Sequence, residues 1–113
     1  MDDWKSALLR ELEMAEMARA RGNEGQARVC ARRAAGIALR EYFRQRGIKV
    51  RSSSAYDLLQ VFSRLADTPP HQQKRAAHLI VRVTEEFKLP VHVDLIEEAR
   101  LLCQDLLPEA FSL

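Results

Sequence analysis

Five side chains that carry positive charge or donate hydrogen bonds recur within a short stretch of the chain: His71, Lys74, Arg75, His78 and Arg82. On an α-helix, at about 100° per residue, these positions share an arc of roughly 100°. Such a row of donors predicts a ligand-binding surface for phosphate groups, with an affinity that falls as the salt concentration rises. The alternative interpretation is a solvated helix face, because Glu85 and Glu86 follow closely and balance the charge.

Arginine dominates the cations of this chain. There are 14 arginines and 4 lysines among 113 residues, and the formal net charge is +2. The planar guanidinium fork suits carboxylates and phosphates. Five arginines between residues 24 and 46 are therefore candidates either for an anion clamp or for ion pairs with Glu13 and Glu16: Arg28, Arg32, Arg33, Arg40 and Arg44.

Motifs for enzyme chemistry are sparse. The segment 22–25 contains two glycines but lacks the lysine and hydroxyl residue of a phosphate-binding loop. No cysteine, histidine and carboxylate set has the spacing of a zinc site, so we expect no metal and no cofactor. Cys30 and Cys103 lie among apolar neighbours, which predicts buried reduced thiols rather than a disulfide framework.

The elements that must position these side chains are helices. No run alternates with period two, and apolar residues recur three and four positions apart. The expected helices cover about 3–20, 24–46, 54–66, 69–87 and 95–107, with Ser54, Thr68 and Asp94 as N-terminal caps and a polar, basic connection over 48–53. We therefore predict an all-α fold, a five-helix up-and-down bundle. Its single domain would span 1–107, and 108–113 would form a tail.

The second helix is the most informative element. It is long and rich in alanine, and its small side chains, with Gly36, allow neighbouring helices to approach closely. A second apolar strip, formed by Val29, Leu39 and Phe43, is separated from the main apolar face by arginines. A helix with two apolar strips is either central in the bundle or shared with a second subunit. We assign Val29, Leu39 and Phe43 to a homodimer interface.

Composition excludes several classes of protein. A chain of this length favours one domain and can bury about two-thirds of its surface, which is enough for a core without disulfides or metal. No apolar run is long enough to span a bilayer, so no membrane association is expected. The first residues are acidic and lack the apolar run of a signal peptide, and we expect a cytoplasmic protein.

Three segments carry a resemblance to a known family. Gly22-Asn23 precedes an Ala-rich stretch from Ala27 to Leu39, Ser54 to Leu59 begins a short third helix, and Lys88-Leu89-Pro90 precedes the last helix. This order resembles the HEPN family, the prokaryotic and eukaryotic nucleotide-binding helical domains, over roughly residues 5 to 107. The resemblance implies a helical bundle that homodimerises and binds a nucleotide or RNA, often beside a nucleotidyltransferase partner in a toxin–antitoxin pair.

Some HEPN members are metal-independent RNases that use an arginine followed closely by a histidine. Arg64 and His71 are the pair that matches this spacing, and they are the candidate catalytic residues that the resemblance implies. Leu65 stands where active members usually have a polar residue, and Pro69-Pro70 precede His71. These departures favour a non-catalytic binding domain. A degenerate RNase and a helical protein-interaction adaptor are the alternatives.

Overall fold

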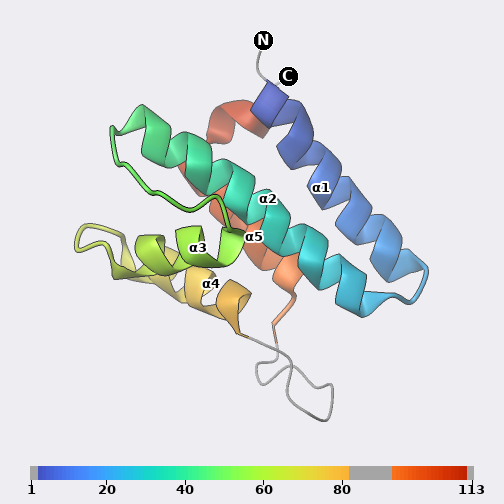
Figure 1. Ribbon diagram of the computed structural model, residues 1–113. Helices are drawn as coiled ribbons and strands as arrows, with labels where there is room; N and C mark the ends of the chain where they lie inside the picture. The colour runs from blue at the N-terminus through green and yellow to red at the C-terminus, as the bar shows by residue number, and fades with distance from the viewer. Residues whose placement is uncertain (1–2, 82–92, 112–113) are drawn as a thin grey trace.

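The computed structural model describes residues 3–81 and 93–111 (Figure 1). These residues form five α-helices, one short 3-10 helix and no strand: α1 (Asp3–Ala20), α2 (Glu24–Gln45), α3 (Ala55–Arg64), α4 (Pro70–Ile80), α5 (Leu95–Leu106) and η1 (Pro108–Phe111). The prediction of an all-α chain with five helices is therefore confirmed for this part of the molecule. None of the helices described combines the length and the apolar character needed to cross a bilayer.

Helix α2 occupies the middle of the fold. α1 runs along one side of it, α5 lies behind it, and α3 packs on the remaining side, with α4 bridging α3 and α5 (Figure 1). Most of the α2 residues that face these neighbours are small and completely buried: Ala27, Cys30, Ala31, Ala34, Ala35 and Ala38. Small contact residues bring helix axes close together. Of the two interpretations of this helix, the central position is the one observed.

The second apolar strip of α2, which was predicted to face another subunit, is mostly buried within a single copy of the chain. Leu39 is 0% and Phe43 is 2% exposed in a single copy of the chain, while Val29 is 36% exposed. The assignment of Leu39 and Phe43 to a dimer interface is therefore wrong. α3 and the segment before it pack against this side of α2, so the second apolar strip completes the core of the chain itself.

The path of the chain after α2 explains this packing. Gly47 adopts a φ of 70°, a conformation that favours glycine, and the backbone then turns back alongside α2. Ser53 accepts a hydrogen bond on its carbonyl from the Arg40 guanidinium at 3.3 Å. Ala55 then lies so close to the middle of α2 that a Cβ on Gly36 would come within 2.8 Å of the Ala55 Cβ and 3.0 Å of its Cα. α3 thus begins beside the middle of α2 rather than at its end.

Two of the three predicted helix caps are confirmed. The Ser54 hydroxyl accepts from the Asp57 N–H at 3.5 Å, and the Asp94 carboxylate accepts from the N–H groups of Ile96 and Glu97 at 3.1 and 3.2 Å. These caps satisfy backbone donors that the first helical turn leaves unpaired.

The third predicted cap is wrong. α4 begins after Pro69 without any side-chain cap, and the Thr68 hydroxyl instead donates to the buried carbonyl of Phe62 at 3.1 Å. α4 is also shorter than predicted: it ends at Ile80 because Val81 is extended, with ψ 131°. Residues 82–87 of the predicted helix lie outside the described residues.

Residues 108–111 form a short helix and not an extended tail. Pro108 follows α5 and starts the 3-10 helix η1, in which Ala110 is buried, and Leu107 before it is also buried. Residues beyond the predicted boundary at 107 thus contribute to the core. Cys30 and Cys103 are both buried and free, as predicted, and burial raises the pKa of the Cys103 thiol to about 12.

Candidate anion-binding site

Three of the predicted donors on α4 lie next to carboxylates of α5: His71, Arg75 and His78. Arg75 lies 3.3 Å from Asp105 through Nη1 and 3.5 Å from Glu98 through Nε. His78 Nδ1 contacts the other oxygen of Glu98. His71, in the first turn of α4, belongs to the same network, and its Nε2 lies 3.6 Å from Asp105. Two carboxylates of α5 thus occupy the donors that were expected to hold phosphates.

Arg75 and His78 are therefore engaged within the protein, and their role as ligand-binding residues stays a prediction. Their side chains are 24% and 18% exposed, and both contact Glu98. Lys74 is exposed on the outer side of α4, and Arg82 lies outside the described residues. The sequence pattern identified the donors correctly but contained no information about the acidic face that meets them.

Removing the shared carboxylate should loosen the contact between α4 and α5. We expect Glu98→Gln to lower the free energy of unfolding by about 1 kcal/mol, because Arg75 and His78 lose the charge that satisfies them at a largely buried position. Glu97→Gln is the matched control: Glu97 pairs with Arg100 at the surface, and its loss should cost less than about 0.5 kcal/mol. Urea denaturation of the two variants measures the difference, and equal values would contradict a role for Glu98 in joining the helices.

The two candidate catalytic residues lie on either side of the turn between α3 and α4. Arg64 is the last residue of α3 and His71 lies in the first turn of α4, and both are exposed. In the described part of the chain, no hydrogen bond or ion pair joins them, and His71 faces Asp105 instead.

Three arginines of α2 lie at two different places in the fold. Arg32 donates to the backbone carbonyls of Leu79 and Val81 at 2.6 and 2.7 Å, so it binds the C-terminal end of α4. The predicted partner Glu16 is taken by Arg100 at 3.0 Å, so pairing of Glu16 with the α2 arginines is wrong. Arg40 and Arg44 lie further along α2, and these two contribute to a cavity.

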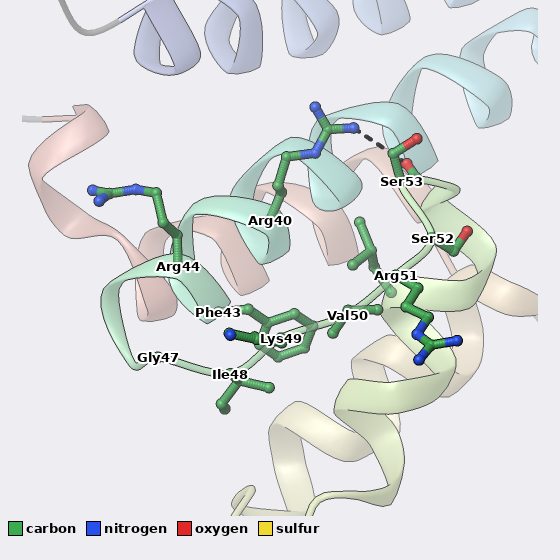
Figure 2. A pocket seen from close by; sticks show the side chains of 11 residues that line it. Arg40, Phe43, Arg44, Gly47, Ile48, Lys49, Val50, Arg51, Ser52 and Ser53 are labelled. Atoms are coloured by element: carbon green, nitrogen blue, oxygen red, sulfur yellow. Dashed lines mark hydrogen bonds between the residues drawn. The ribbon is translucent and has the colours of Figure 1, made fainter.

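The cavity lies where the chain turns back along α2, and we call it the basic cavity. Its volume is about 470 Å³, which falls within the range typical of small-molecule sites. Figure 2 shows Phe43 directed from α2 toward the returning segment, with Arg40 and Arg44 on the helix and Arg51 on the far side. Its walls come from α2, the connection and α3: Arg40, Phe43, Arg44, Gly47, Ile48, Lys49, Val50, Arg51, Ser52, Ser53 and Leu58.

The lining combines an apolar base with a cationic rim. Phe43, Ile48, Val50 and Leu58 supply the apolar surface, and they belong to the core or pack against it. Four cations and no carboxylate belong to the lining: Arg40, Arg44, Lys49 and Arg51. An apolar pocket with a few charged groups at its mouth suits a ligand that has a flat apolar part and an anionic part.

The rim cations differ in how far they are neutralised. Arg44 is held by Glu41, with Nε 2.9 Å from Oε1, and these bonds lower the pKa of the Glu41 carboxyl. Lys49 and Arg51 are exposed and form no ion pair with any described residue. The backbone N–H groups of residues 49–53 likewise donate to no acceptor in this part of the chain. The rim is therefore a concentration of positive charge and of N–H donors that no described residue engages.

Comparisons of the chain with protein-family models, curated proteins and solved structures found no match. The class that fold and site define is therefore a helical domain with a basic cavity of ligand size. The sequence signal for this site is the basic connection over 48–53, where Lys49 and Arg51 precede a run of serines. By itself that basic segment indicates only a linker, because it comes next to Arg40 only when the chain reverses after α2.

Proposed function

We propose that this protein is a non-catalytic, HEPN-like helical domain that binds the phosphate of a nucleotide or of RNA in the basic cavity. The observation that carries the proposal is the apolar cavity whose rim holds Lys49 and Arg51 without counter-ions among the described residues. Guanidinium, ammonium and free peptide N–H groups are the donors that proteins use for phosphate. The apolar base of the cavity, formed by Phe43, Ile48, Val50 and Leu58, gives a nucleobase a surface to pack against.

The same rim supports binding rather than catalysis. Cleavage of RNA without a metal needs a general base and a general acid near the phosphate, and histidine is the usual choice. None of the lining residues is a histidine, a carboxylate or a cysteine. No group of histidine, cysteine and carboxylate residues capable of holding a metal ion occurs within 3–81 and 93–111.

The binding test uses adenosine 5′-monophosphate and isothermal titration calorimetry at low salt. We expect Lys49→Ala combined with Arg51→Ala to weaken binding by about tenfold, equivalent to ~1.4 kcal/mol, and to reduce its salt dependence. Arg64→Ala combined with Lys74→Ala is the matched control, because it removes the same two charge types from the α3–α4 face. The control should leave the affinity within about twofold. A larger loss in the control would move the site to that face and contradict the proposal.

A second proposal concerns assembly, and it is favoured by exposed apolar side chains on the α1–α2 hairpin. Met14, Met17 and Val29 are 37%, 50% and 36% exposed, and both methionines border a shallow hollow at Cys30. We propose this face as the surface for a homodimer or for a nucleotidyltransferase partner, since exposed methionines are common at adaptable contact surfaces.

Sedimentation velocity tests the assembly proposal. The wild-type protein should sediment as a dimer at micromolar concentration, and Met17→Glu should convert it to a monomer with an unchanged thermal midpoint at low concentration. Leu9→Glu, an equally exposed apolar position on α1 that does not border the hollow, is the control and should leave the dimer intact. A monomeric wild-type protein would exclude the homodimer.

A further inference from the structure

A second cavity shares two arginines, Arg40 and Arg44, with the basic cavity. It is formed between the start of α1 and the second half of α2, and its volume is about 330 Å³. Trp4, Ala7 and Ile37 give it apolar walls. Arg40 and Arg44 line both this cavity and the basic cavity, and we call these two residues the divider. We call the second space the Trp4 cavity.

We infer that the two cavities together bind a dinucleotide, two nucleobases joined through phosphate. In this arrangement, the linking phosphate lies on the Arg40–Arg44 divider, one base enters the basic cavity beside Phe43, and the other enters the Trp4 cavity. The inference rests on the proposed function, because it assumes phosphate binding at this rim. It adds a second base and therefore a preference for ligands longer than one nucleotide.

The charges of the Trp4 cavity favour a base there rather than a second phosphate. Asp3 and Glu41 are the acidic residues of its lining, and they offset the charges of Arg40 and Arg44. Because Arg44 keeps the pKa of Glu41 below its ordinary value, that carboxyl is ionised at neutral pH. Carboxylates repel phosphate, and the exposed Asp3 carboxylate can accept a hydrogen bond from the amino group of a base, whereas Glu41 already accepts from Arg44 and Gln45. An indole ring adds a stacking surface that every base can use.

The divider retains donors for the linking phosphate even though Arg44 is partly engaged. Arg44 gives its Nε and Nη2 groups to Glu41, and its Nη1 group donates to no acceptor in the described residues. Arg40 gives only one bond to the described part of the chain, from Nη2 to the Ser53 carbonyl. A guanidinium group has five N–H donors, so both arginines can still bind a phosphate oxygen. Glu41 fixes the orientation of Arg44 while leaving that remaining donor available.

The chain supplies its own probe for this arrangement, because Trp4 is the single tryptophan. A base that stacks in the Trp4 cavity would quench the indole fluorescence, whereas a ligand confined to the basic cavity would leave it unchanged. The titration therefore compares adenosine monophosphate with the RNA dinucleotide ApA and with 5′,5′-linked diadenosine diphosphate. The last two ligands separate an RNA segment from a free dinucleotide as the source of the two bases.

We expect one of the two dinucleotides to quench Trp4 and to bind about tenfold more tightly than adenosine monophosphate by calorimetry, and the preferred linkage identifies the source. Trp4→Leu should abolish this gain without changing the affinity for the mononucleotide, and Trp4→Phe should retain most of it. If the mononucleotide binds at the rim and neither dinucleotide quenches Trp4 or binds more tightly, the dinucleotide inference is wrong while the proposed function stands. If no ligand binds, both are wrong.

Discussion

Leu39→Ala is expected to lower the free energy of unfolding by about 2–5 kcal/mol, the range for truncating a fully buried leucine. Leu39 has no exposed surface, and it lies on the side of α2 that packs against α3. Truncation leaves a cavity at the centre of the fold, where rigid helices on several sides limit collapse. Urea denaturation monitored by circular dichroism measures the loss.

A matched variant separates a core role from an interface role. Leu9→Ala makes the same truncation at an exposed position of α1 that does not border the hollow at Cys30, and it should change stability by less than about 0.5 kcal/mol. Truncating a core residue lowers the free energy of unfolding equally at all protein concentrations, whereas truncating an interface residue gives a loss that depends on protein concentration. If the difference between the urea midpoints of Leu39→Ala and the wild-type protein shrinks on dilution, Leu39 lies at a dimer interface and the fold described is contradicted.

Gly36→Ala is expected to destabilise the protein by about 1–3 kcal/mol, although alanine is the better helix former. The added methyl group would lie 2.8 Å from the Ala55 Cβ and 3.0 Å from its Cα, so the start of α3 must move. Neither atom belongs to a flexible side chain that can turn away. The displacement would also disturb the segment that encloses the basic cavity.

Gly25→Ala, on the same helix, is the control with the opposite sign. Its nearest neighbour is the Asn23 side-chain oxygen at 3.9 Å, an ordinary contact. Helix propensity should therefore dominate, and stability should rise by up to about 1 kcal/mol. Adding Ala55→Gly to Gly36→Ala removes the closest of the new contacts and should recover part of the loss. Equal effects of Gly36→Ala and Gly25→Ala would show that α2 and α3 are not in close contact.

Local features of the chain were predictable because local interactions decide them. The Ser54 and Asp94 caps depend on a side chain and on N–H groups two or three residues later, and both are observed. The bounds of α1 and the unbroken length of α2 follow in the same way from spacing and from the residues at their ends. Thr68 shows the limit of this reasoning, since its hydroxyl bonds to the more distant Phe62 carbonyl instead of capping the helix.

The site was not predictable because it depends on the path of the chain. Leu39 and Phe43 were expected outside the core, and the reversal after Gly47 places α3 over them. The same reversal brings Lys49 and Arg51 beside Arg40 and creates the basic cavity. On α4 the donors were identified, but the carboxylates that engage them come from α5, far away in the sequence. Patterns along one helix do not reveal which helix it will face.

Chemical-shift mapping with adenosine monophosphate tests the central claim most directly. In ¹H–¹⁵N spectra recorded during the titration, we expect the amide signals of residues 40–53 to move, with the largest changes at Lys49 to Ser53. Their N–H groups have no acceptor among the described residues, and they border the cationic rim. Shifts confined to residues 70–80 of α4 and their partners on α5, or no shifts at millimolar nucleotide, would contradict the claim that the basic cavity binds phosphate.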